Sequence, residues 1–148
     1  MPMIDIYAPR STFANPHQLA VDAAATVMSV EQVPDIALFR QNTAAFVHEL
    51  DAAMFSDVDG SSRHVRVQVL TNSGALDRDK QLAVVERLTT LVTDAAHDPA
   101  LREQTWVLLT EAPEGGWGLA GHAHTNAELV QKARKELASA SSDVPQRP

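Results

Sequence analysis

The sequence contains two copies of one pattern, 63 residues apart. The tetrapeptide Gln-Leu-Ala-Val begins at Gln18 and again at Gln81, and an alternating apolar segment precedes each copy. In residues 3–8 isoleucines alternate with other side chains, and in residues 64–70 valines do so. Alternation with a period of two is typical of β-strands. The repeat therefore restricts the chain to folds that are built from two similar units.

A helix is predicted after the first strand of each unit. In the first unit Asn15 is placed to cap the helix, Pro16 occupies its first position, and the apolar stripe ends near Val30. In the second unit Asp77 can cap a longer helix, which Asp98 and the proline after it end. The apolar face of this second helix is expected to consist of Leu82, Val85, Leu88, Val92 and Ala95.

Each helix is followed by a second strand, at residues 43–50 and 105–110. Because a helix connects the two strands of a unit, each pair should be parallel. We expect an α/β (α+β) fold with a mixed four-stranded sheet and two helices packed on it. Unit one would span residues 2–60 and unit two residues 61–121, with a glycine-rich turn at 114–121.

The chain after the two units has a helix signal and then a polar tail. Thr125 and Glu128 have the spacing of a capping box, which predicts a last helix over residues 125–138. Residues 139–148 have the composition of a disordered tail. One domain over residues 1–138 is therefore expected.

Charge and composition exclude several classes of function. The net charge of −7 disfavours nucleic-acid binding, and the absence of cysteine rules out thiolate chemistry and disulfides. No segment resembles a signal peptide or a membrane span, so a cytoplasmic protein is expected. His122 and His124 form a His-x-His pair without an evident third ligand, so a solvated loop is expected there, with neither metal nor cofactor.

Several segments resemble the tautomerase superfamily, and 4-oxalocrotonate tautomerase in particular. They are Met1-Pro2, the strand segment at 106–111, and the glycine-rich segment at 114–121, in the order and spacing of a fused, two-unit member. The resemblance covers most of residues 2–121. It implies the tautomerase fold, a homotrimer, and a small acidic enol or keto acid as substrate. It also implies that Pro2, once Met1 is removed, is the catalytic base.

The chain also departs from the pattern of the family. Val65 stands where unit two would carry a proline, so one active site per chain is expected. The second-strand positions that carry a substrate-binding arginine in 4-oxalocrotonate tautomerase are occupied here by Ala44 and Trp106. The arginine pair of the dehalogenase and decarboxylase branches is missing as well. The resemblance therefore implies a superfamily and no particular activity.

An N-terminal proline can act as a base because it is a free secondary amine. A free α-amino group has a pKa of about 7.7–8.0, and an apolar pocket lowers that pKa because the ammonium form is desolvated. Pro2 could then remove a proton next to a carbonyl group. Such a reaction also requires a group that holds the substrate's acid and a donor for its enolate oxygen.

Other residues are candidates for these remaining roles. Arg10 and Arg40 could bind a carboxylate, since a guanidinium can grip it at two oxygens. Asn42 and His48 could donate to the enolate oxygen. The candidates for the apolar pocket wall are Phe55 and Trp117.

A second interpretation assigns the chain no catalytic activity. The order β-α-β-β-α-β also describes ferredoxin-like modules, which bind small molecules or other proteins. The missing arginines would suit such a module, and Pro2 would then be incidental.

Overall fold

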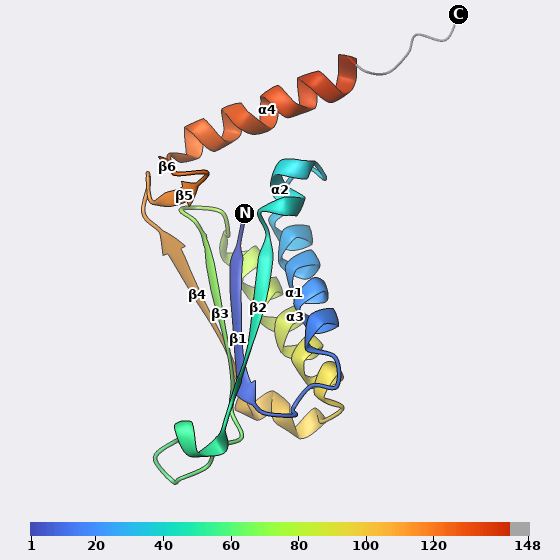
Figure 1. Ribbon diagram of the computed structural model, residues 1–148, viewed down its shortest axis with the longest axis vertical. Helices are drawn as coiled ribbons and strands as arrows, with labels where there is room; N and C mark the ends of the chain where they lie inside the picture. Colours follow the sequence, from blue (N-terminus) through green and yellow to red (C-terminus); the bar gives the residue numbers. More distant parts are fainter. Residues whose placement is uncertain (143–148) are drawn as a thin grey trace, which may run out of the picture.

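The computed structural model describes residues 1–142 and is built on a mixed four-stranded sheet with two long helices on one face (Figure 1). The strands lie in the order β2-β1-β3-β4, with β1 and β3 antiparallel in the centre and a parallel neighbour at each edge. Their bounds are β1 Met3–Pro9, β2 Ala44–Leu50, β3 Val65–Asn72 and β4 Thr105–Ala112. The predicted sheet is therefore confirmed, including the parallel pairing within each unit.

Two long helices, α1 (Pro16–Glu31) and α3 (Arg78–Ala96), cover one face of the sheet. The predicted caps are present: the side chain of Asn15 accepts from Gln18 N at 3.0 Å, and that of Asp77 accepts from Lys80 N at 2.9 Å. Three short helices were not predicted: α2 (Ala37–Gln41), η1 (Ala52–Met54) and η2 (Pro99–Gln104). Segments of three to six residues are too short to show helical periodicity in a sequence.

The hydrophobic core lies between the sheet and these two helices. Its members on the central strands alternate with residues of the other face: they are Ile4, Ile6, Val65, Val67 and Val69. No helix of residues 1–142 covers the opposite face of the sheet, which exposes large apolar side chains at Met3, Phe46, Trp106 and Leu108. Monomeric soluble proteins rarely expose an apolar face of this kind.

The apolar face predicted for α3 is confirmed at Leu88 and Val92 and wrong in its first turns. Leu82 and Val85 are exposed, and the buried face runs through Val84, Leu88 and Val92. These three residues are equivalent to the buried Leu19, Ala23 and Val27 of α1 at an offset of 65, whereas the tetrapeptide repeat has an offset of 63. The repeated letters therefore do not occupy equivalent positions in the two helices.

The glycine-rich segment is a β-hairpin rather than a simple turn. Strand β5 (Trp117–Leu119) pairs with β6 (His122–His124) in antiparallel fashion. The two residues between them, Ala120 and Gly121, both have positive φ, which two-residue hairpin turns of type I′ require. The predicted loop at His122 and His124 is therefore also wrong.

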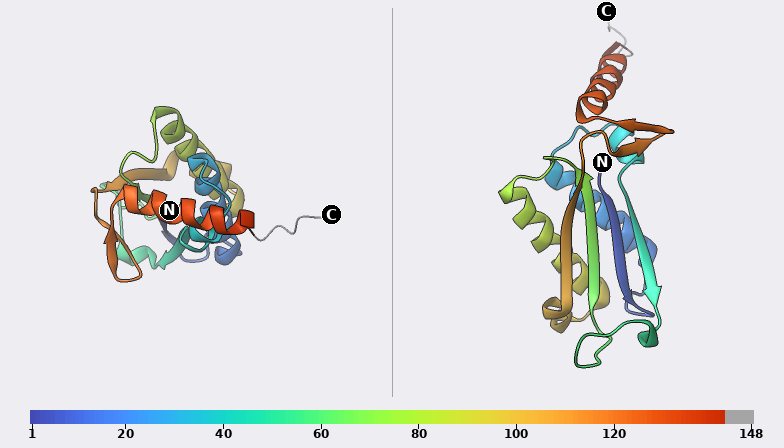
Figure 2. Two further views of the ribbon diagram at one scale, coloured as in Figure 1. Left: turned by 90° about the horizontal axis from the view of Figure 1, so that it is seen from above. Right: turned by 90° about the vertical axis from the view of Figure 1, so that its left-hand side faces the viewer.

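The last helix, α4 (Asn126–Ser142), crosses the end of the sheet at which β1 begins, and Figure 2 shows it lying over the N-terminus. It continues four residues beyond the predicted end, and the serine hydroxyl groups at 139, 141 and 142 donate to carbonyl oxygens one turn earlier. The prediction of disorder is thus wrong for 139–142, and the rest of that tail, 143–148, lies outside the described residues. Within residues 1–142, no helix has the length and apolarity needed to cross a membrane.

Candidate active site

The N-terminus of the chain is buried, although chain ends usually lie at the surface. Met1 is 3 % exposed and Pro2 is less than 2 % exposed. The carbonyl oxygen of Pro2 accepts a hydrogen bond from Ala44 N at 3.3 Å, which continues the pairing of β1 with β2. The sheet therefore fixes Pro2 at the start of a central strand.

A cavity of about 410 Å³ opens beside Met1. Its walls come from the end of α1 and the segment after it, from the β3–α3 connection, and from α4, which lies over the N-terminus in Figure 2. The apolar lining residues include Val33, Pro34, Phe39, Ala75, Leu129, Val130, Ala133 and Leu137. Because the nitrogen of Pro2 is bonded to the carbonyl carbon of Met1, removal of Met1 would expose that nitrogen to the space that Met1 fills beside this cavity.

A buried carboxylate lies beside the N-terminal amine. Oε2 of Glu31 is 3.4 Å from the Met1 nitrogen, and Oδ1 of Asn72 is 3.5 Å from the same atom. The other carboxylate oxygen of Glu31, Oε1, is buried and has no hydrogen-bond partner among the described residues. Glu31 is thus the acidic group of the cavity, and one of its two buried oxygens has no partner among the described residues.

Burial shifts both groups of this pair toward their neutral forms. It lowers the pKa of the Met1 amine, and the charge of Glu31 only partly opposes this effect. It raises the pKa of the Glu31 carboxyl group, which the amine and Lys80 only partly oppose. An amine in this place is therefore held closer to its free-base form than an amine in water.

A second cavity, of about 360 Å³, lies against Pro2 on another side. Asn42 and Trp117 both line it, so the structure brings these two predicted site residues together with Pro2. The Nδ2 atom of Asn42 donates to Leu38 O at 2.8 Å, which fixes the amide at the end of α2. Trp117 is supplied by β5 of the hairpin.

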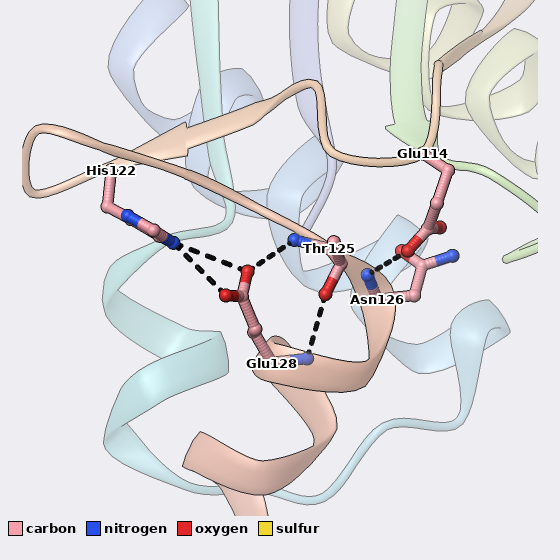
Figure 3. Close-up of polar contacts among 5 residues, drawn as sticks. All are labelled: Glu114, His122, Thr125, Asn126 and Glu128. Atoms are coloured by element: carbon pink, nitrogen blue, oxygen red, sulfur yellow. Dashed lines mark hydrogen bonds and ion pairs between the residues drawn. The ribbon is translucent and has the colours of Figure 1, made fainter.

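The start of α4 is held by a set of polar contacts, shown in Figure 3. Thr125 N donates to Oε2 of Glu128 at 2.7 Å, and Glu128 N donates to Oγ1 of Thr125 at 3.2 Å, which confirms the predicted capping box. The backbone N–H of Thr125, and after it His122, lower the pKa of Glu128. Asn126 N donates to the Glu114 carboxylate at 2.8 Å.

The far half of α4 is fixed as well. The carboxylate of Glu136 accepts from the backbone N–H of Leu38 in α2 at 3.2 Å. At the near end, the side chain of Asn126 donates to Ser73 O at 2.9 Å. Because both ends of α4 are anchored, it forms a defined wall of the cavity beside Met1.

Neither of the two predicted carboxylate-binding arginines lines the cavity beside Met1 or the cavity beside Pro2. Arg10 follows β1 at its opposite end, eight residues and roughly 26 Å from Pro2 at ~3.3 Å per residue, and it pairs with Asp51. Arg40 pairs with Asp35 at 2.9 Å and lines a different cavity, beside α1. Both guanidinium groups are exposed.

His48 and Phe55 also lie apart from Pro2. His48 is on the open face of the sheet, where its Nε2 atom is 2.6 Å from Asp5 Oδ1 and its ring stacks on Tyr7. Phe55 ends the short helix η1 at the far end of β2. Among residues 1–142, no three His, Cys, Asp or Glu side chains are grouped to hold a metal ion.

Sequence reasoning missed the polar and charged residues of the cavity, which are Glu31, Gln32, Asn72, Ser73, Asn126 and Arg134. One signal for Glu31 was available, because it follows the predicted last residue of the first helix and is an acidic residue at a helix C-terminus, where the macrodipole disfavours it. Arg134 lies on α4, and no spacing in the sequence relates that helix to the N-terminus.

The sequence matches no protein-family model and no curated protein. Solved structures of similar fold exist. Pt0534 inactivated by 2-oxo-3-pentynoate has a TM-score of 0.70 and 18 % identity, and the match covers 86 % of this chain and 98 % of that one. The F6 fused 4-OT asymmetric trimer has a TM-score of 0.69 and 14 % identity, with 86 % and 98 % covered.

A third similar structure is N1, a member of the cis-3-chloroacrylic acid dehalogenase family. Its TM-score is 0.69 at 18 % identity, and the match covers 96 % of this chain and 99 % of that one. These proteins belong to one superfamily, and each match extends over nearly the whole of the other chain. The predicted resemblance is thus confirmed at the level of fold: the chain has the fold of the tautomerase superfamily.

Proposed function

We propose that the mature protein is a tautomerase that uses the nitrogen of Pro2 as its general base. Removal of Met1 would convert the Pro2 nitrogen from an amide into a secondary amine. That amine would take a proton from the carbon next to a carbonyl group of a small keto or enol acid and return it elsewhere on the substrate.

The observation that carries this proposal is the buried N-terminus. Pro2 is enclosed at the start of a central strand, and the residue before it opens into a cavity of about 410 Å³. Burial lowers the pKa of the Met1 amine, and the Pro2 nitrogen, which belongs to a residue less than 2 % exposed, would be desolvated in the same way once Met1 is removed. The fold supports the same reading, since the similar structures include fused 4-OT.

We also propose that the protein acts as a homotrimer. The open face of the sheet exposes Phe46, Trp106 and Leu108, and a subunit interface would cover them. The F6 fused 4-OT of similar fold is itself a trimer.

Covalent labelling tests the proposed base. The similar protein Pt0534 is inactivated by 2-oxo-3-pentynoate, an electrophilic keto acid. We expect this reagent to label the mature protein on Pro2, with peptide mapping by mass spectrometry as the readout. The matched control is a chain with an uncleaved N-terminal extension, in which Pro2 is an amide and should remain unmodified. Labelling at lysines alone, or equal loss of activity in the extended chain, would contradict the proposal.

A non-catalytic binding module is the second candidate. It is favoured by one observation, which is that Arg10 and Arg40 are paired with carboxylates away from Pro2. If the module interpretation holds, the mature protein will bind the keto acid without being labelled at Pro2 and without turning it over.

A further inference from the structure

Glu31 lies in a place that is unfavourable for a carboxylate in three respects. It is buried, it occupies the last residue of α1, where the helix dipole disfavours negative charge, and its Oε1 atom has no partner among the described residues. Perturbed acids of this kind are concentrated at functional sites. Its only polar side-chain contact among the described residues is the amine of Met1, a residue that the mature protein would lack.

Glu31 lies beside the residue that the mature protein would lose. Its Oε2 atom is 3.4 Å from the Met1 nitrogen, and both residues line the same cavity. Lys80 donates to the main-chain oxygen of Glu31 at 3.0 Å, which fixes the end of α1 without occupying the carboxyl group. Removal of Met1 would therefore leave the Oε2 atom without its present partner, next to the space that Met1 fills and one residue from the Pro2 nitrogen.

We propose that Glu31 is the acid that works opposite Pro2, and that the substrate is a keto acid with one carboxylate and an apolar body. This inference rests on the proposed function of Pro2. In enolisation the Pro2 nitrogen takes the proton of the C–H bond, and the Glu31 carboxyl group gives its proton to the carbonyl oxygen. After the enol leaves, the Pro2 ammonium returns its proton to the Glu31 carboxylate, which restores both groups. Ketonisation follows the same steps in reverse.

The cavity wall determines the substrate class. Along α4, Leu129, Ala133 and Leu137 present an apolar stripe to the cavity, and Phe39 faces it from α2. Arg134 carries the one positively charged side chain among the described residues that line the cavity, and it is exposed, which puts it at the rim. A single carboxylate would therefore be bound at the rim, away from Glu31, with the apolar body along α4. A second carboxylate would meet either the apolar wall or Glu31.

The test measures ketonisation by the mature protein and three variants. Glu31→Gln keeps the shape of the side chain and removes the acid, Glu31→Asp keeps the acid on a shorter side chain, and Glu103→Gln makes the same change on an exposed residue away from the cavity. With phenylenolpyruvate we expect Glu31→Gln to lower kcat roughly 100-fold or more with little change in KM. Glu31→Asp should restore part of the loss, and Glu103→Gln should match the wild type.

Two further readouts separate a proton donor from a structural residue. The pH–rate profile of the Glu31→Gln variant should lack one limb of the wild-type profile. Labelling of Pro2 by 2-oxo-3-pentynoate should persist in the variant. The wild type should also have at least a tenfold higher kcat/KM for phenylenolpyruvate than for enol-oxaloacetate, a dicarboxylate.

The outcomes distinguish this inference from the function on which it rests. A kcat for Glu31→Gln within twofold of Glu103→Gln, while Pro2 is still labelled, overturns the role of Glu31 and leaves the proposed base standing. A preference for the dicarboxylate overturns the substrate class. Absence of labelling at Pro2 in the wild type overturns the proposed function itself.

Discussion

At the scale of single residues, Glu31 links the stability of the fold to pH. Burial raises its pKa above the ordinary value of 4.5. The folded chain therefore keeps this proton over a pH range in which the unfolded chain has already released it. The free energy of unfolding must then fall as the pH rises from about 4.5 through the raised pKa.

This linkage predicts how Glu31→Gln changes stability. The glutamine has no proton to lose, so the variant should be as stable as the wild type at pH 4 or slightly less so. It should become the more stable of the two as the pH rises through the raised pKa of the wild-type carboxyl group. Thermal unfolding of both proteins with Met1 retained, at pH 4 and pH 7.5, measures the difference. A difference that is independent of pH would show that burial does not perturb this carboxyl group.

At the scale of elements, the strands were predictable and the start of the second helix's buried face was not. Strand periodicity is two, so Ile4 and Ile6 revealed the buried face directly, and the structure buries both. In the second helix, apolar residues stand at both 82 and 84, and helical spacing from Leu82 was compatible with the pattern. The structure buries Val84 and exposes Leu82, because packing against the sheet determines which apolar residues of the first turns face the core.

The candidate site was only partly predictable for a related reason. Pro2, Asn42 and Trp117 lie in segments that the repeat and the resemblance already marked, and the structure brings them to one cavity. Glu31 and Arg134 reach the N-terminus through tertiary packing of α1 and α4. No local pattern encodes that packing, because three strands of the sheet, the helices α2 and α3, two short 3-10 helices and the hairpin lie between the two residues in the sequence.

At the scale of the whole molecule, the open face of the sheet determines the assembly that we propose. Phe46 and Leu108 occupy equivalent places on the two edge strands and are 49 % and 47 % exposed. A carboxylate at either place would be buried without a partner in an interface, which is costly. We therefore expect Phe46→Asp and Leu108→Asp to convert a trimer into monomers, as measured by size-exclusion chromatography with light scattering.

The control for this prediction is Val58→Asp, in a loop where the side chain is fully exposed. It should leave the trimer intact. If Phe46→Asp and Leu108→Asp also remain trimeric, the open face of the sheet is not the interface.

The central claim is that a free secondary amine at Pro2 performs the chemistry, and the N-terminus itself offers the most direct measurement. Ketonisation of phenylenolpyruvate is compared for the mature protein, for Pro2→Ala, and for a chain with an uncleaved N-terminal extension, each checked by intact mass. We predict that the mature protein is active, that Pro2→Ala loses roughly 100-fold in kcat/KM, and that the extended chain falls to the uncatalysed rate. An extended chain as active as the mature protein would contradict the account, because its Pro2 nitrogen is an amide and cannot accept a proton.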